Sequence, residues 1–218
     1  MPAHMRHRVL SLISVIGLVG AVWSCSMSGS MRVADDAPIP CLGMSRRTLM
    51  AKGDDLWGVE DARKWDYIVI HHSATDQGSL ASIDFYHRYE RKPVFENGCA
   101  YHFVVGNGTG TGDGQVEPSQ RWDQQLDSTA TRNDQMNSEG MNVCLVGDFE
   151  KYEPTPGQMQ ALRELVVYLM LKHGIPSRRV FDHKDVNPPG SPTECPGKFF
   201  PMRELKTEIE EAERSFYR

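Results

Sequence analysis

The stretch DYIVIHH, residues 66–72, decides the fold, because a nearly continuous apolar run ends abruptly on two histidines. Such a run is typical of a central strand that is buried on both faces. Two interpretations of its end are open. Either the imidazoles of His71 and His72 are simply accommodated there, or the rigid strand end holds one of them in place for chemistry. The rest of the chain has to decide between the two.

Further elements alternate along the chain after this strand. The turn-rich run NGTGTGDG joins AYHFVVG, residues 100–106, to QVEPS, which is typical of a hairpin. A further strand-like stretch follows at residues 141–149, and residues 178–186 indicate a short strand that runs into a loop beginning at His183. Strands that alternate with helices predict a single α/β domain with a central sheet flanked by helices. The sheet is expected to be mixed, since the hairpin is antiparallel and the other strands need crossovers.

Helical patterns separate these strands. The clearest is TPGQMQALRELVVYLMLKHG, in which Thr155 is the expected N-cap, Pro156 takes the first position and Gly174 ends the helix. A shorter helix is expected over residues 82–92, with Ser82 as its N-cap. A terminal helix is expected in PMRELKTEIEEAERSF.

Composition narrows the classes of function. The chain has 218 residues, a formal net charge of −5 and a pI near 5.9, so it lacks the basic footprint of a nucleic-acid-binding protein. It contains no H-E-x-x-H helix motif, which argues against a zinc peptidase of that type. Hydrophobic residues make up 39% of the chain, which is enough for a packed core.

The N-terminus differs from the rest. A basic start, an apolar run at residues 9–23 and small residues around Cys25 are typical of an export signal. We therefore expect residues 1–25 to be a signal peptide or lipoprotein signal, 26–64 a tether and N-terminal extension, and 65–218 the folded domain. Three alternatives stay open: lipidation of Cys25, plain cleavage nearby, or a signal anchor that attaches the chain to the membrane. Each predicts an exported protein of the periplasm or cell envelope. Export permits disulfides. The remaining candidate for a disulfide is a bond between Cys41 and Cys99.

Three residues can form a metal site. His71 ends the first strand, His183 follows the last strand, and Cys195 lies in the loop TECPG. Two imidazoles and a thiolate suit zinc with its fourth position open, as a catalytic zinc keeps it. The spacing alone leaves alternatives open, because a histidine at a strand end is often structural and a lone cysteine is often a small buried apolar residue.

Five motifs in order carry a resemblance to a known family: YIVIHHSAT, AYHFVV, NVCLVGDF, the helix from Thr155, and FDHKDV followed by TECPG. Together they resemble the zinc-dependent N-acetylmuramoyl-L-alanine amidases, which include phage amidase-type lysozymes and peptidoglycan recognition proteins. The resemblance implies that fold, a zinc cofactor, and His71, His183 and Cys195 as its ligands. It implies that Tyr101 is a catalytic residue beside the zinc, and that Thr193 supports the oxyanion.

The same resemblance implies the reaction. The substrate would be peptidoglycan or a muropeptide, and the amide between N-acetylmuramic acid and L-alanine would be hydrolysed. Recognition members commonly replace the cysteine, so Cys195 favours an enzyme. Two departures matter: Cys144 stands where some relatives carry a catalytic Glu, and residues 125–140 lack the His that many relatives carry there. The alternative is therefore a non-catalytic peptidoglycan-binding module of the same fold.

Overall fold

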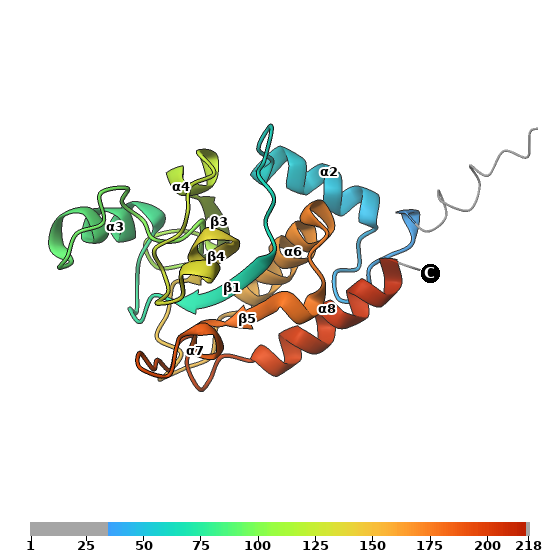
Figure 1. Cartoon of the computed structure of the whole chain (residues 1–218). Coiled ribbons are helices and arrows are strands. Elements are labelled where there is room, and N and C mark those ends of the chain that lie inside the picture. Colours follow the sequence, from blue (N-terminus) through green and yellow to red (C-terminus); the bar gives the residue numbers. More distant parts are fainter. Residues whose placement is uncertain (1–34, 217–218) are drawn as a thin grey trace, which may run out of the picture.

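The computed structural model describes residues 35–216, and its centre is one five-stranded mixed sheet (Figure 1). In the strand order β3-β2-β4-β1-β5, β1 is parallel to β4 and β5, β2 is parallel to β4, and β3 is antiparallel to β2. The α/β class and the mixed sheet are thus confirmed. The strands are β1 (Tyr67–His72), β2 (Phe103–Asn107), β3 (Asp113–Pro118), β4 (Gly140–Leu145) and β5 (Val180–Asp182).

Helices flank this sheet (Figure 1). The longest, α6, begins after the N-cap Thr155 with Pro156 in its first turn, and ends at Gly174 in a left-handed conformation, as predicted. The α-helices are α2 (Arg46–Trp57), α3 (Leu80–Phe85), α4 (Gln120–Asp123), α5 (Asp134–Ser138), α6 (Pro156–His173), α7 (His183–Val186) and α8 (Met202–Phe216). A π-helical turn, η1 (Tyr86–Glu90), continues α3, and a 3-10 turn, η2 (Ser177–Arg179), precedes β5.

The two faces of the sheet have different surroundings. Side chains alternate along a strand, so Ile68 and Ile70 of β1 face the main hydrophobic core together with α6 and α8. Val69 and His71 face the other side, where small apolar clusters leave room for polar groups. In the β1–β4 register, His71 pairs with Cys144 and Val69 with Asn142. The candidate site therefore lies on the face opposite the main core.

The packed unit begins upstream of the expected boundary at residue 65. Leu49 and Trp57 of α2 are buried in the main core, where α2 packs against α6. A Cβ atom at Gly53 would lie 2.1 Å from Cδ2 of Tyr168, so only glycine lets the two helices approach this closely. At least residues 46–57 of the expected extension thus belong to the folded domain.

Three local expectations differ from the structure. The N-cap of α3 is Ser79, and Ser82 is the third helical residue, whose side chain completes the capping box. β2 begins at Phe103, so Tyr101 lies in the bend before the strand rather than in it. His183 is the first residue of the short helix α7, not of a loop.

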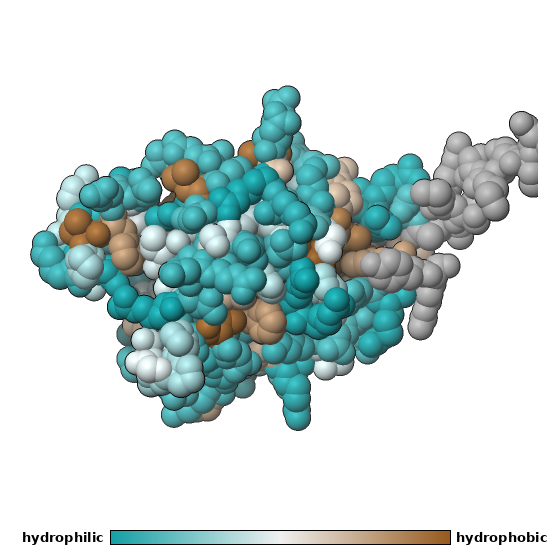
Figure 2. Space-filling model, in the orientation of Figure 1, coloured by the Kyte–Doolittle hydropathy of each residue, from teal (hydrophilic) through white to brown (hydrophobic). Residues whose placement is uncertain are grey.

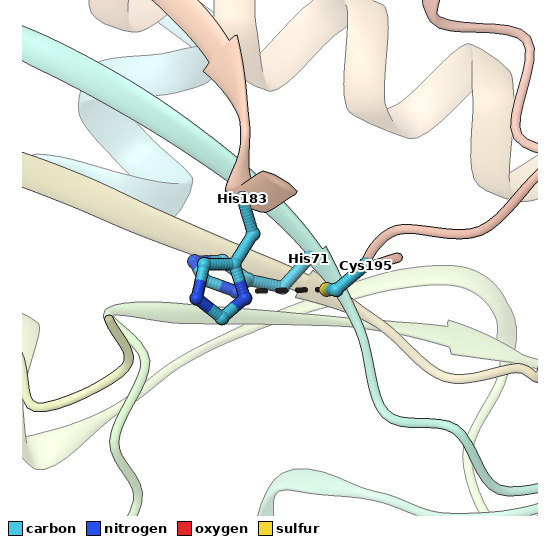
Figure 3. Close-up of side chains that lie close together, drawn as sticks. All are labelled: His71, His183 and Cys195. Atoms are coloured by element: carbon cyan, nitrogen blue, oxygen red, sulfur yellow. Dashed lines mark hydrogen bonds between the residues drawn. The ribbon is translucent and has the colours of Figure 1, made fainter. Parts of the chain in front are cut away.

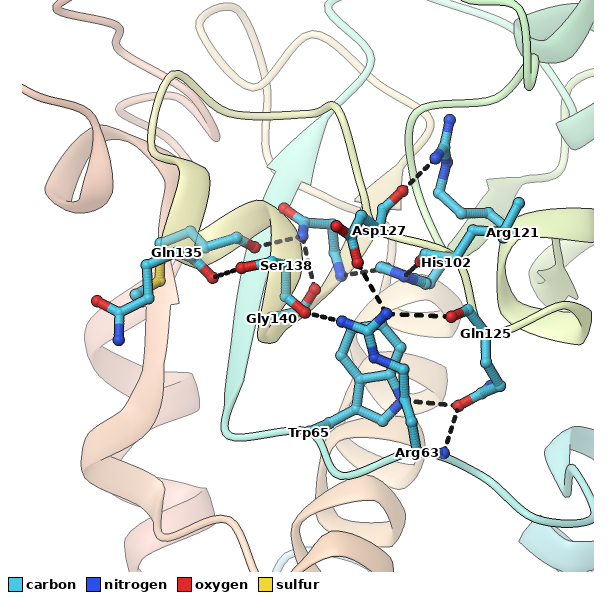
Figure 4. Close-up of polar contacts among 12 residues, drawn as sticks. Arg63, Trp65, His102, Arg121, Gln125, Asp127, Gln135, Ser138 and Gly140 are labelled. Carbon is cyan, nitrogen blue, oxygen red and sulfur yellow. Dashed lines mark hydrogen bonds and ion pairs between the residues drawn. The ribbon is translucent and has the colours of Figure 1, made fainter.

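A polar network ties the segment before β1 to the loop before β4 (Figure 4). The Arg63 guanidinium donates to the Gln125 carbonyl oxygen at 3.2 Å and to the Asp127 carboxylate at 2.7 Å. The indole N–H of Trp65 donates to Oε1 of Gln125 at 2.9 Å. The Arg63 guanidinium also donates to the Ser138 carbonyl, so the network holds both ends of the segment that leads from α4 to β4. Residues of this segment line a hollow beside His183.

The described residues limit what can be said of the termini and the cysteines. The expected signal at residues 1–25, with Cys25, lies outside residues 35–216. Within that range no helix is long and apolar enough to cross a membrane. The cysteines there, Cys41, Cys99, Cys144 and Cys195, are all free thiols, so the pairing of Cys41 with Cys99 is not formed. The face of the molecule drawn in Figure 2 is mostly hydrophilic. Small groups of apolar side chains lie on it, one of them around α3.

Candidate metal centre and its surroundings

The three residues expected to bind metal lie together at the carboxyl end of β1 (Figure 3). One ligand atom each of His71, His183 and Cys195 lies within 4.8 Å of the others. His71 comes from the end of β1, His183 from the start of α7, and Cys195 from the loop that follows α7. The backbone N–H of Lys184 donates to the carbonyl of Cys195 at 2.8 Å, which holds this loop against α7.

His71 is buried, with 1% of its surface exposed, and its ring is oriented by Asn142. The Nδ2 group of Asn142 donates to the carbonyls of Met136 and Gly140, so its Oδ1 must face His71 and accept from Nε2 at 2.8 Å. The Nδ1 atom of His71 then carries a lone pair, 3.8 Å from Sγ of Cys195. Burial, and next the neighbouring His183, hold the pKa of His71 well below its usual value, so the imidazole is neutral.

His183 is oriented in the same way by Asn187. Oδ1 of Asn187 accepts from the backbone N–H of Arg132 at 2.9 Å, and its Nδ2 donates to the Ser191 carbonyl at 3.0 Å. That amide oxygen also accepts from Nε2 of His183 at 3.1 Å, which leaves Nδ1 free to bind a metal. Burial lowers the pKa of His183, which favours the neutral ring.

The chemistry of Cys195 fits a cation between these rings. Burial raises the pKa of its thiol to about 12, although the backbone N–H of His72 acts in the opposite direction. The backbone N–H of His72 points at Sγ, at 3.4 Å, and suits a thiolate acceptor. A metal ion deprotonates a coordinating thiol outright. Two neutral imidazoles, each with an oriented second nitrogen, and one buried thiol are therefore a donor set that fits zinc.

Tyr101 lies beside this cluster. Its ring centroid is 5.1 Å from that of His71. Burial, followed by the thiols of Cys144 and Cys195, raises the pKa of Tyr101 well above its usual value. The phenol thus carries its proton near neutral pH and can donate a hydrogen bond.

Thr193 positions Cys195 in the structure. Its Oγ1 accepts the backbone N–H of Cys195 at 3.2 Å, which closes the turn that carries the thiol. Because the hydroxyl oxygen is the acceptor in this bond, its proton is still available to another partner. The role of Thr193 toward a substrate stays a prediction, as do the roles of the other site residues.

Two histidines complete the surroundings. His72 points to the strand face opposite to that of His71, where its Nδ1 accepts the backbone N–H of Phe149 at 3.2 Å. His87, in the turn η1, is buried next to Tyr101. Its Nδ1 accepts the backbone N–H of Ala100 at 3.1 Å, and its ring lies 5.9 Å from that of Tyr101.

Removing the Asn142 amide should weaken metal binding without touching a ligand. We expect Asn142→Leu to bind zinc about 10–100-fold less tightly, because His71 loses the partner that fixes its tautomer and orientation. Zinc affinity is measured by competition with a chelator, and the unfolding free energy of the metal-free variant is measured alongside.

Asn142→Asp is the matched comparison, because it keeps an acceptor for Nε2 of His71. It should retain more of the zinc affinity than Asn142→Leu. An Asn142→Leu protein that folds and binds zinc as tightly as the unmodified chain would contradict this role of Asn142.

Comparison with known proteins gives a family and a fold. Residues 61–198 match the family described as N-acetylmuramoyl-L-alanine amidase. The endolysin of Klebsiella phage KP32 is 33% identical over 148 residues, which cover 64% of this chain and 88% of that protein.

Solved structures agree with this match. N-acetylmuramoyl-L-alanine amidase LysC from Clostridium intestinale URNW superposes with a TM-score of 0.56 at 27% identity, over 67% of this chain and 85% of that one. The Ph2119 endolysin from Thermus scotoductus MAT2119 bacteriophage superposes with a TM-score of 0.53 at 22% identity, over 68% and 86% of the two chains, and supports the fold alone.

Proposed function

Because the chain belongs to the N-acetylmuramoyl-L-alanine amidase family and is a peptidoglycan amidase, we propose that it hydrolyses the bond between N-acetylmuramic acid and L-alanine with one zinc ion. The observation that carries the proposal is the donor set of His71, His183 and Cys195, gathered within 4.8 Å at the end of a buried strand. The substrate is peptidoglycan or a muropeptide released from it.

The zinc ion would be held by His71, His183 and Cys195. When bound, zinc supplies Lewis-acid polarisation and lowers the pKa of a coordinated water from 15.7 to about 7. The chain's own contribution is rigidity, because Asn142 and Asn187 fix both imidazole rings before any metal binds.

Tyr101 is the residue we assign to charge stabilisation. Amide hydrolysis adds water to the carbonyl carbon, so negative charge develops on the carbonyl oxygen before the C–N bond breaks. A phenol that burial keeps protonated is suited to donate a hydrogen bond to that oxygen. Thr193, whose hydroxyl proton is free, is a second and weaker donor.

We further propose that the protein works outside the cytoplasm, in the periplasm or cell envelope. This rests on the export-type sequence of residues 1–25, and on Cys25 as a candidate site for a lipid that would attach it to the membrane. The mass of the mature N-terminus distinguishes a lipidated Cys25 from plain cleavage and from an uncleaved anchor.

Zinc content and amide cleavage, measured on the same preparation, test the proposed reaction. The full chain is purified, its zinc is quantified, and it is incubated with peptidoglycan and with a soluble muramoyl peptide. We expect one zinc per chain, and stem peptides that begin with L-alanine in the mass spectrum of the products. These peptides should vanish with a chelator and return with added zinc.

Two other results would reject the proposal. A zinc-loaded chain that binds muropeptides of several stem types without releasing peptide is a recognition module of this fold. A folded chain that takes up no zinc after reconstitution does not use His71, His183 and Cys195 as its ligands.

A further inference from the structure

Two hollows lie beside the candidate site, one lined in part by Tyr101 and the other in part by His183. The first, of about 450 Å³, is lined by Ser73, Gln77, Tyr86, His87 and Tyr101, among others, and we call it the neutral arm. The second, of about 370 Å³, is lined by residues that include Arg91, Phe95, Thr131, Arg132, His183 and Asn187, and we call it the basic arm. The turn η1 and its continuation supply residues to both.

The arms differ in charge. No acidic side chain lines either one, and the neutral arm has no lysine or arginine. Its His87 is also uncharged near neutral pH, since burial lowers the pKa of that ring to about 4. The basic arm has two guanidinium groups, and among the ion pairs of residues 35–216 none involves Arg91 or Arg132. In a chain of net charge −5, this is a local excess of positive charge.

Arg91 is held in place but not neutralised. Its guanidinium lies 4.0 Å from the centre of the Phe95 ring, and Nη1 donates to the Pro93 carbonyl at 2.7 Å. A guanidinium carries five N–H donors, so most of its donors have no protein partner in the described part of the chain. A stacked arginine with free donors is suited to bind a carboxylate through two parallel hydrogen bonds.

Arg132 is linked directly to the metal centre. Its backbone N–H and Nε2 of His183 share one acceptor, Oδ1 of Asn187, at 2.9 and 3.1 Å. Its exposed side chain extends from the 125–140 segment, which lacks the histidine that many relatives carry. The basic arm is thus contiguous with His183, while the neutral arm reaches the centre through Tyr101.

The two sides of the bond to be cleaved differ in the same way as the two arms. On one side is a muramic acid whose lactyl carboxyl is already an amide, which leaves a neutral sugar with hydroxyl and acetamido groups. On the other side is a peptide that bears carboxylates. An anion is stabilised beside unpaired guanidinium groups, and a neutral sugar is not.

We propose that the basic arm binds the peptide side of the substrate, with Arg91 and Arg132 recognising a carboxylate of the stem, and that the neutral arm takes the sugar. This assignment rests on the proposed function, because it takes the muramoyl peptide as the ligand. It makes Arg91 and Arg132 specificity-determining residues, and predicts that the enzyme prefers stems with a free carboxylate to amidated ones.

Binding to the metal-free full chain tests the assignment independently of catalysis. The probes are N-acetylmuramoyl-L-alanyl-D-glutamate and its analogue with both glutamate carboxyls amidated, titrated by calorimetry. We expect the acid to bind at least about tenfold more tightly than the diamide, and rising salt to reduce the difference. The variant Arg91→Gln with Arg132→Gln should bind the two probes equally.

Arg203→Gln is the matched control. It removes one positive charge from an exposed side chain of α8, outside both arms, and should keep the preference for the acid. If the double variant fails to fold, the single variant Arg132→Gln is tested in its place, because no side-chain hydrogen bond of Arg132 occurs among residues 35–216. This variant should lose part of the preference for the acid over the diamide.

Several results would overturn the assignment. One is an unmodified chain that binds the acid no better than the diamide, including a chain that binds neither. Another is a folded double variant that keeps the preference. Amide cleavage by the zinc-loaded chain is scored separately: preference without cleavage counts against the proposed reaction alone, and cleavage without preference counts against this assignment alone.

Discussion

Replacing Cys195 by serine is expected to abolish tight zinc binding and, with it, amide hydrolysis. The substitution removes the one anionic ligand of the set, and a serine hydroxyl does not ionise in its place near neutral pH. Loss of an outer hydrogen-bond partner costs about 10–100-fold in metal affinity, so loss of a ligand should cost more. The measurements are the zinc stoichiometry after dialysis and the release of peptides that begin with L-alanine.

Cys41→Ser is the control for this variant. Cys41 is half-buried against the main core and also a free thiol, but it lies outside the metal centre. It should keep zinc and activity, although the loss of a packed thiol can lower stability slightly. A folded Cys195→Ser protein that retained one zinc per chain would remove Cys195 from the ligand set.

Replacing Tyr101 by phenylalanine should separate catalysis from metal binding. Only the hydroxyl group is lost, and its ring contact with His71 is kept. We expect unchanged zinc content and a kcat reduced by about 10²–10³-fold, the usual cost of losing one donor to a developing oxyanion. Steady-state kinetics on a soluble muramoyl peptide give kcat and KM separately, and the loss should fall on kcat.

Tyr67→Phe provides the comparison for the lost hydroxyl. Tyr67 lies at the start of β1, and its hydroxyl accepts from the Gln135 amide at 3.3 Å, outside the metal centre. This variant should turn over normally. Near-normal turnover by Tyr101→Phe would exclude the Tyr101 phenol from the mechanism. Loss of zinc from Tyr101→Phe would instead show that the hydroxyl supports the structure of the metal centre.

The sequence predicted those parts of the fold whose patterns are strong and local. The apolar runs of β1 and β4 and the capped, periodic α6 were recognised because each has enough residues to define its period and its ends. The packed position of α2 was not. Its segment RRTLMAKGDDLW is half charged or polar, and only contacts with α6, more than 100 residues away, reveal that Leu49, Gly53 and Trp57 are buried.

The residues of the candidate site were likewise predicted only in part from the sequence. His71, His183 and Cys195 were candidate ligands on their chemistry alone, but the resemblance was needed to choose them, since nothing local links residues so far apart in the chain. Asn142 and Asn187 were missed, although Asn142 carried an indication: it is the one amide side chain in an otherwise apolar strand stretch, MNVCLV. The two arms could not be anticipated, because they are formed by loops whose approach depends on tertiary contacts.

The distribution of the three ligands along the chain sets when the centre can form. His71 and Cys195 are 124 positions apart, and β2, β3, β4 and β5 all lie between them in the chain. A polypeptide is synthesised from its N-terminus, so the thiol emerges after all five strands of the sheet have been made. A product that ends between residues 183 and 195 has both imidazoles but no Cys195 thiol. On the proposed ligand set, the zinc site can therefore be completed only after every strand of the sheet has been synthesised.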